Sequence, residues 1–493
     1  MQGTGGRIVK NIRVMLVGQL ITWSIGLVWI IYLPRYIGDT DMGRYAIAMA
    51  IWAIMSSIIN TGTATHLTKE IARSPDKAAE LLGTALIQRY IVFLICCVPV
   101  AAYVYFMQYS SETVVLICIV AMTMPGFHTI LTLNAIFQGR EIMQYIPLVE
   151  IFMKGLMLII SLVFMFMGLG IREIAAASIV SSGIAVAIQF AILRNYIPIR
   201  FTWNSALSSD MLRRSWPYCV SSLVLIIYGE IDKLIMPIMV NEQTVGWYSI
   251  AGALAATLIF IPNILTTAVF PALARGADGA SRILRKSLDV ALITGVPIGF
   301  GLAIVANPLV ELIYQSQFPQ SGPVLSVMSI TLIFTYVATV LGRFLVASDL
   351  TNAWTLAMIA GITLAFPLNF VLIPWTEQMF GNGAIGGALR LLITEFLMAI
   401  FAMWMLPSGT LTRENASVAL RIFAAGGVMV AACWFVRDMF IAIPVLVGMV
   451  TYTLMILLLR VLKPEDMDMV LNATRGALAA LRLRPGGSRA PGE

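Results

Sequence analysis

The chain has 493 residues, of which 59% are hydrophobic and 12% are charged, whereas a typical soluble protein carries about 25% charged residues. A helix needs about 20 apolar residues to cross a bilayer core, and we trace fourteen such stretches in this sequence. The segments between them are too short for a soluble catalytic domain, which needs about 50 residues or more. The composition therefore predicts an all-α integral membrane protein and excludes a soluble enzyme.

The net charge is +7, but Lys and Arg flank the apolar stretches instead of clustering in a folded basic face. We therefore expect no nucleic-acid partner. The five cysteines lie inside apolar stretches without the spacing of metal ligands. No disulfide, metal site or cofactor is expected, apart from a coupling ion.

The predicted spans are 14–37, 43–64, 84–107, 113–137, 146–167, 172–193, 216–239, 245–272, 287–307, 322–346, 352–374, 383–406, 417–436 and 440–462. The first span follows Arg7, Lys10 and Arg13 but is too long for a signal peptide. Most Lys and Arg fall on one side when the N-terminus is placed inside. This bias predicts an even number of spans with both termini in the cytoplasm.

Part of the chain repeats after 203 positions. Identities occur at Pro34/Pro237, Gly43/Gly246, Tyr45/Tyr248, Ile47/Ile250, Ala48/Ala251 and Ala50/Ala253. Because each copy holds an even number of spans, we expect two parallel six-helix lobes around a central cleft, plus two extra helices. The predicted units are the N-terminal lobe (1–200), the C-terminal lobe (201–412), helices 13 and 14 (413–462), and a cytoplasmic amphipathic segment with a disordered tail (463–493).

The motifs resemble a known family. Asp39-Thr-Asp-Met-Gly-Arg-Tyr45 and Thr65-His-Leu-Thr-Lys-Glu-Ile-Ala-Arg73 resemble the signature of polysaccharide-biosynthesis flippases, the Wzx type of the multidrug/oligosaccharidyl-lipid/polysaccharide exporter superfamily. Val245-Gly-Trp-Tyr248 and Val269-Phe-Pro-Ala-Leu-Ala-Arg275 are similar to the second-lobe pattern of these exporters. The resemblance covers roughly residues 8–462 and is diffuse, without one sharp motif.

This resemblance implies a flippase that moves a polyprenyl-pyrophosphate-linked oligosaccharide across a bacterial cytoplasmic (inner) membrane by alternating access. The implied partners are that substrate and membrane lipids, with polysaccharide polymerase and glycosyltransferases as further candidates. A cation-coupled multidrug exporter of the same superfamily is the alternative. A membrane-embedded polymerase is disfavoured, because the longest predicted outer loop, 308–321, has a single acid and neither a base nor a histidine. We therefore expect no enzyme activity.

A pyrophosphate carrier needs basic side chains in its cleft, since an anion is costly to bring into low dielectric. Four bases are candidates: Lys154, Arg390, Arg35 and Arg343. For Lys154 a salt bridge with Glu150, four residues earlier, is an equally good explanation. Snorkelling towards the interface competes for Arg390, and interfacial anchoring is favoured for Arg35 and Arg343.

Four acids are candidates for coupling transport to H⁺ or Na⁺: Asp232, Glu230, Glu150 and Glu395. Glu230 and Lys233 are three residues apart and share a helix face, which leaves Asp232 without that partner. An unpaired intramembrane carboxylate suits a titrating group, while a bridge to another helix is the alternative. Asp232 is therefore the first choice for coupling.

Overall fold

The computed structural model describes residues 4–199, 201–274 and 279–461, and within these ranges the regular structure is helical without a strand. The helices are α1 (Thr4–Asn60), α2 (Thr63–Arg73), α3 (Ala78–Met107), α4 (Ser111–Gly139), α5 (Tyr145–Phe166), α6 (Ile171–Leu193), α7 (Ser205–Met239), α8 (Glu242–Ala256), α9 (Phe260–Ala274), α10 (Ala280–Tyr314), α11 (Ser321–Ala347), α12 (Thr351–Phe380), α13 (Gly383–Trp404), α14 (Arg413–Trp434) and α15 (Ala442–Leu458), with 3-10 turns η1 (Pro75–Lys77) and η2 (Gln315–Gln317). The predicted amphipathic segment and tail, 463–493, lie outside the described residues.

Among the described residues, eleven helical segments are long and apolar enough to cross a membrane. One of them, Val17–Asn60, covers the first two predicted spans. The more polar α7 and the short apolar α15 lie at two further predicted spans, so each of the fourteen predicted spans coincides with helical structure. The all-α multi-pass architecture is confirmed.

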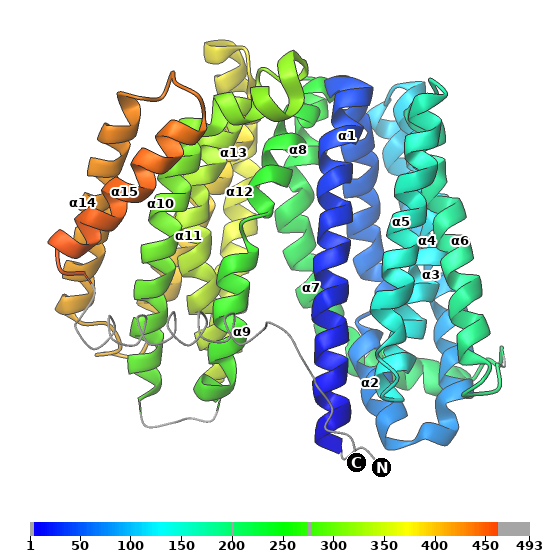
Figure 1. Cartoon of the computed structure of the whole chain (residues 1–493). Coiled ribbons are helices and arrows are strands. Elements are labelled where there is room, and N and C mark those ends of the chain that lie inside the picture. The colour runs from blue at the N-terminus through cyan, green and yellow to red at the C-terminus, as the bar shows by residue number, and fades with distance from the viewer. Residues whose placement is uncertain (1–3, 200, 275–278, 462–493) are drawn as a thin grey trace, which may run out of the picture.

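The first two predicted spans are the two helical segments of α1, which meet at a sharp bend. The bend lies at Gly38, whose φ of 80° and ψ of −178° are accessible to glycine and strained for other residues. Pro34 lies one turn earlier and removes a backbone donor from the helix. The bend therefore divides α1 into a first segment, 4–37, and a second segment, 39–60, which runs back beside the first from the motif that begins at Asp39 (Figure 1).

The predicted span 245–272 is broken into α8 and α9. Pro262 lacks the N–H that would bond the carbonyl of Leu258 four residues earlier. The Tyr336 hydroxyl donates to that Leu258 carbonyl over 2.6 Å instead. The break therefore leaves this carbonyl satisfied, which explains how a non-helical segment is tolerated inside an apolar span.

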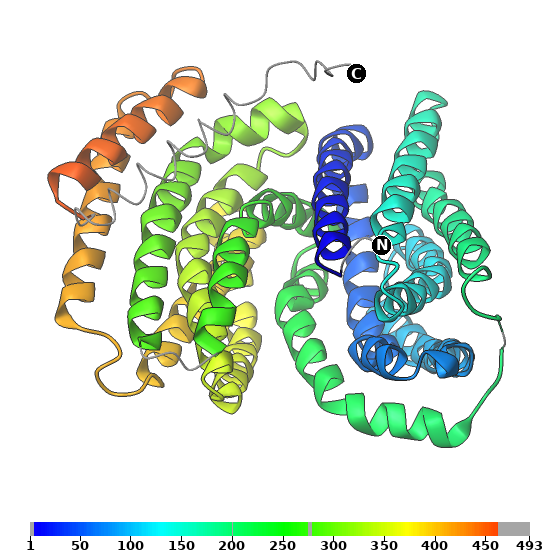
Figure 2. The ribbon, with the colours of Figure 1, turned by 60° about the horizontal axis from the view of Figure 1, so that its bottom comes forward.

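The helices form two groups that Figure 1 shows side by side, with α1 and α3 to α6 on one side and α8 to α13 on the other. α14 and α15 cover the outer edge of the second group, far from α3 to α6 (Figure 2). α7 joins the two groups. Its first half bonds the first group through Ser208 and Gln88 (2.9 Å), and its second half bonds α12 through Asp232 and Asn369 (2.7 Å). The predicted lobe boundary after residue 200 stays a prediction.

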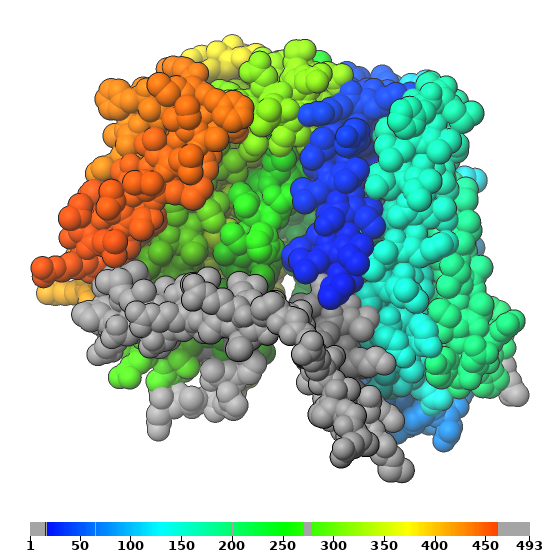
Figure 3. Space-filling model, viewed as in Figure 1, coloured from blue at the N-terminus to red at the C-terminus, as the bar shows by residue number. Residues whose placement is uncertain are grey.

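The two groups share an apolar core at one end only. The largest buried cluster includes Ile47 and Ala48 of α1 together with Val245 and Tyr248 of α8. Figure 3 shows a continuous surface at this end and a hollow between α9 and the first segment of α1. We name these the closed end and the open end. The molecule is therefore sealed on one side of the membrane region and parted on the other.

Candidate functional site

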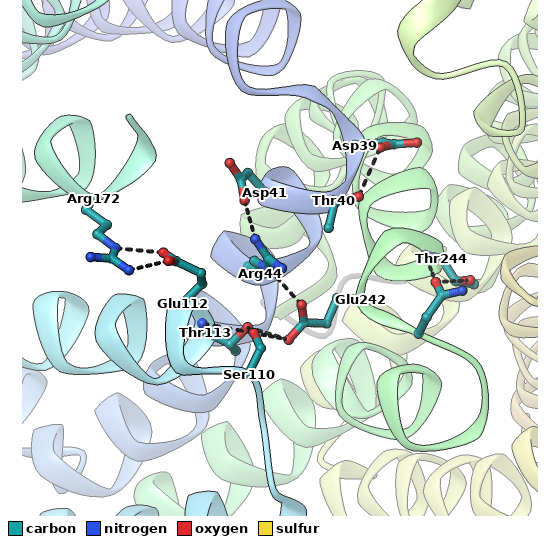
Figure 4. Close-up of polar contacts among 11 residues, drawn as sticks. Asp39, Thr40, Asp41, Arg44, Ser110, Glu112, Thr113, Arg172, Glu242 and Thr244 are labelled. Carbon is teal, nitrogen blue, oxygen red and sulfur yellow. Dashed lines mark hydrogen bonds and ion pairs between the residues drawn. The ribbon is translucent and has the colours of Figure 1, made fainter. Parts of the chain in front are cut away.

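The closed end is sealed where the bend of α1 meets the start of α8. A methyl group on Gly43 would collide with the carbonyl oxygen of Glu242, and one on Gly246 would collide with that of Asp39. Arg44 Nε donates to Glu242 over 2.7 Å, and Glu242 also accepts from Ser110 (2.9 Å) and Thr113 of the first group (Figure 4). Glycine at 43 and 246 is what permits this backbone-to-backbone approach.

The contact follows the sequence repeat. At the offset of 203, Asp39 corresponds to Glu242 and Arg44 corresponds to Trp247. Trp247 Nε1 donates to Asp39 over 2.9 Å, which is the counterpart of the bond from Arg44 to Glu242. Gln243 adds a 2.7 Å bond to Asp39. The two copies therefore meet through equivalent residues across an approximate two-fold axis.

Arg35 strengthens the same closure and does not offer its guanidinium to the open hollow. It donates to the carbonyl of Leu312 over 3.1 Å and to that of Ile313, both at the end of α10. In return, the Tyr314 hydroxyl donates to the carbonyl of Ile30 over 3.1 Å. Arg35 therefore bridges the two groups, and its role as a cleft cation stays a prediction.

Asp232 is not the unpaired carboxylate that its spacing from Lys233 suggests. Arg390 donates to it through Nε over 2.8 Å and also through Nη2. Tyr248 and Asn369 donate over 2.6 Å and 2.7 Å. The side chains of Arg390 and Asp232 are 0% and 1% exposed, so the pair lies wholly inside the second group. Of the two interpretations of Asp232, the structure therefore has the bridge to another helix, formed with Arg390 of α13, and not the unpaired carboxylate.

Glu395 lies in the same interior, one helical turn beyond Arg390. It is 8% exposed and accepts a 3.0 Å hydrogen bond from the Tyr228 hydroxyl, which also contacts Thr394 over 2.9 Å. Within the described ranges, no basic side chain forms an ion pair with it. Glu395 therefore differs from the other three predicted acids, each of which has a cationic partner.

Two lysines form partly exposed ion pairs near one cavity. Lys154 lies 2.8 Å from Glu150, and Lys233 lies 2.7 Å from Glu230. A cavity of about 410 Å³ between α1, α4, α5, α6 and α7 is lined by apolar side chains and several hydroxyls, including Met153, Met157 and Ile226. Met157 lies three residues after Lys154 on α5, and Ile226 lies four residues before Glu230 on α7, so each ion pair lies about one helical turn from a residue that lines the cavity.

The lysine pairs differ from the interior pair in their exposure. The Lys154 and Glu150 side chains are each 37% exposed, so the ammonium group is paired and still accessible. The predicted salt bridge exists, and it does not exclude a role in binding an anion. Arg343 is exposed on α11, and no hydrogen bond or ion pair is found for it in the described part of the chain.

Arg89 was not predicted, although it lies five positions inside the predicted span 84–107. It is 1% exposed and donates to Asn60 (2.8 Å), Thr132 (2.6 Å) and the carbonyl of His128 (3.0 Å). All of these acceptors are neutral, so Arg89 ties α3 to the end of α1 and to α4 without a carboxylate. The sequence signal that could have identified Arg89 is a basic residue inside an apolar stretch.

An apolar groove of about 650 Å³ runs between α10, α14 and α15. Pro297 and Leu302 line it from α10, and Pro444 and Met449 line it from α15. It reaches Leu258 and Ile261 at the break between α8 and α9, so it approaches the hollow from the outer edge of the second group.

The polysaccharide biosynthesis protein family matches residues 8–277, more than half of the chain. The chain belongs to this family. A relative from Haloferax volcanii, "Probable flippase AglR", is 23% identical over 485 residues, covering 94% of this chain and 97% of the relative. "Probable low-salt glycan biosynthesis flippase Agl15" of the same organism is 21% identical over 213 residues, 40% of this chain and 45% of that protein.

The fold is similar to solved transporter structures. The structure of "Lipid II flippase MurJ, inward closed conformation" matches with a TM-score of 0.71 at 13% identity, covering 91% of this chain and 98% of the other. An inward-facing multidrug resistance MATE family transporter matches with a TM-score of 0.60 at 16% identity, covering 82% of this chain and 98% of that chain. At these identities the likeness establishes the fold.

Proposed function

We propose that this protein is a flippase that moves a lipid-linked oligosaccharide across the membrane by alternating access between its two helix groups. The observation that carries the proposal is the contact of repeat-equivalent residues at the closed end, opposite a hollow at the open end. Such an arrangement has a second state in which the closed end parts and the open end closes. Membership of the family and the flippase names of two relatives support it.

We also propose that both termini lie in the cytoplasm of a bacterial cell and that the membrane is the cytoplasmic (inner) membrane. The Lys and Arg bias supports this orientation, because basic residues are retained on the cytoplasmic side. The open end then faces the cytoplasm, where lipid-linked precursors are made, and the closed end faces outwards. In this orientation the structure is an inward-facing state.

The pyrophosphate of the substrate would be received by Lys154 and Lys233. Both ammonium groups are partly accessible, and each can exchange its glutamate for a phosphate oxygen. Arg390 does not fit this role, because it is fully buried and held by Asp232. The polyprenyl chain would lie in the apolar groove between α10 and α15, which carries no charged residue among its lining side chains.

Coupling to H⁺ or Na⁺ would involve Glu395 rather than Asp232. A buried carboxyl that lacks a cationic partner can remain protonated and ionise only when water or a cation reaches it. Glu395 meets this description, whereas Asp232, Glu230 and Glu150 are neutralised by Arg390, Lys233 and Lys154. We therefore place the coupling group on α13, close to Tyr228.

A multidrug exporter is the second candidate, because the cavity near Lys154 is mostly apolar and the fold is also similar to a MATE transporter. Neither the flippase relatives nor the similar transporter structures support a membrane-embedded polymerase. Polysaccharide polymerase and glycosyltransferases remain candidate partners of the flippase. The lysine pairs distinguish the two transporter functions, because basic side chains attract the anionic pyrophosphate and repel a cationic drug.

The test is transport in proteoliposomes that contain a fluorescent polyprenyl-pyrophosphate-linked sugar. Protein-dependent loss of the probe from the leaflet facing the quencher is expected, and Lys154→Ala combined with Lys233→Ala should reduce the rate at least tenfold. Arg413→Ala serves as a control because its side chain is exposed at the start of α14, outside the predicted cleft bases. Transport of ethidium but not of the pyrophosphate lipid would replace the flippase with the exporter.

A further inference from the structure

A second cavity, separate from the groove and from the lysine pairs, lies between α10, α11 and α14. Its volume is about 810 Å³. Its lining residues come from α10, from α11, from α14 and from the turn that follows α14: Phe300, Ala303, Ile304, Asn307, Pro308, Ser326, Ile330, Gly427, Val430, Trp434, Arg437 and Asp438. Because α14 covers the outer edge of the molecule (Figure 2), this cavity is far from the α1–α8 contact.

The polarity of the cavity changes in one direction along all three helices. α10 and α14 run towards the closed end, and α11 runs away from it (Figure 1). On α10 the lining changes from Phe300 to Asn307, about 10 Å further at 1.5 Å per residue. On α11 the residue nearer the closed end is Ser326 and the deeper one is Ile330. The cavity is therefore apolar towards the membrane centre and polar towards the interface.

α14 shows the same gradient and adds charge at the polar end. Gly427 and Val430 lie deep, Trp434 ends the helix, and Arg437 follows. The Arg437 guanidinium stacks 3.7 Å above the Trp434 ring, which fixes it at the cavity mouth. Asp438 lies 3.6 Å from Arg437 and its side chain is 91% exposed, so it points further into water.

We propose that this cavity binds one phospholipid with a zwitterionic phosphoethanolamine headgroup from the leaflet at the closed end. The chain would fill the deep part beside Ile304, Ile330 and Val430. The phosphate would accept hydrogen bonds from Arg437 and from the exposed amide of Asn307, while the outer ammonium group would meet Asp438. The order of apolar lining, cation and anion matches the order of chain, phosphate and ammonium in such a lipid.

The site is independent of the transport proposal, because it needs neither the cleft nor an oligosaccharide. It lies on the other side of α10 from the apolar groove, which has no charged lining residue. A bound lipid would fill the space that separates α14 from α11. We expect it to stabilise the packing of the α14–α15 hairpin on α10.

Native mass spectrometry of the full-length protein, delipidated in mild detergent and titrated with phosphatidylethanolamine or phosphatidylglycerol, tests the site. One phosphatidylethanolamine per protein should bind in preference to phosphatidylglycerol. Arg437→Ala should weaken this binding about tenfold, and Asp438→Lys should reverse the preference. Arg413→Ala, at the opposite end of α14, is the matched control and should bind like the wild type.

Filling the cavity provides a test that does not depend on the charged residues. Gly427 lines the cavity and a Cβ added there meets no atom within 4 Å, so we expect Gly427→Leu to fold and to displace the lipid chain. Gly183→Leu, which also meets no atom within 4 Å, controls for a larger residue in a span. Equal retention of both lipids by the wild type, or unchanged binding by Arg437→Ala and Gly427→Leu, would overturn the proposal.

Discussion

Gly43 and Gly246, 203 positions apart in the sequence, pack backbone against backbone where the two helix groups meet. The residues around them are also repeat equivalents, so the bond from Arg44 to Glu242 is matched by the bond from Trp247 to Asp39. The predicted duplication of one lobe would explain a closure in which equivalent residues bond each other. An interface of this kind is self-complementary, as in a two-fold dimer.

The first prediction concerns this glycine contact. Gly43→Ala should force the closed end apart, because the new methyl group would collide with the carbonyl oxygen of Glu242. Electron paramagnetic resonance distances between labels on α3 and α12 should shift towards a state open at that end, and transport should fall at least tenfold. Gly183→Ala, with no atom within 4 Å of the added methyl, should leave the distances and transport unchanged.

The second prediction concerns the ion pair between Arg44 and Glu242, whose side chains are 23% and 17% exposed. Arg44→Gln or Glu242→Gln should lower the population of the closed state about five- to tenfold, which corresponds to about 1 to 1.4 kcal/mol. Exchanging the two residues in a double variant should restore part of the closed-state population. No recovery in the exchanged variant would assign the effect to Ser110 and Thr113, which also bond Glu242.

The third prediction separates stability from substrate binding at Arg390. Arg390→Ala leaves the carboxylate of Asp232 buried without a cation and should destabilise the protein by about 3–5 kcal/mol. Thermal unfolding in detergent should show a lower midpoint. Replacing both partners, Arg390→Met with Asp232→Leu, should recover much of the loss. A normal unfolding midpoint for Arg390→Ala together with lost transport would return Arg390 to the substrate site.

The fourth prediction concerns coupling. Glu395→Gln keeps the shape and the bond to Tyr228 but cannot ionise, so transport should no longer respond to an imposed H⁺ or Na⁺ gradient. The variant should still bind the pyrophosphate lipid. Asp232→Asn should reduce stability more than coupling, since Arg390 loses its partner. A gradient response in Glu395→Gln equal to that of the parent would exclude Glu395 as the coupling group.

The fifth prediction concerns orientation. In a background without native cysteines, Asp438→Cys should react with an impermeant maleimide in whole cells, and Asp76→Cys should react only after lysis. The side chain of Asp438 is 91% exposed beyond the end of α14, and Asp76 lies in η1 beyond α2, on the opposite side of the predicted membrane. The reverse pattern would invert the topology and place the open end outside.

Composition and hydropathy alone determine that this chain spans the membrane many times. A run of about 20 consecutive apolar residues is the length that a helix needs to cross the hydrocarbon core. The offset of 203 is also visible in the sequence, and the residues that it relates meet at the closed end. The bends are less accessible to sequence analysis. Gly38 and Pro262 are visible there, but whether a span bends or breaks depends on partners such as Tyr336, which satisfies the carbonyl freed at Leu258.

The roles of the charged residues were decided by tertiary structure. Spacing along one helix predicts the pairs Glu150–Lys154 and Glu230–Lys233, because residues three or four apart are neighbours on a helix. It cannot predict that Asp232 of α7 meets Arg390 of α13, since that contact depends on how two distant helices pack. The fold therefore sets the ionic partner of a buried group. Only the folded chain shows that Arg390 pairs with Asp232, whereas Glu395 accepts a hydrogen bond from the neutral Tyr228.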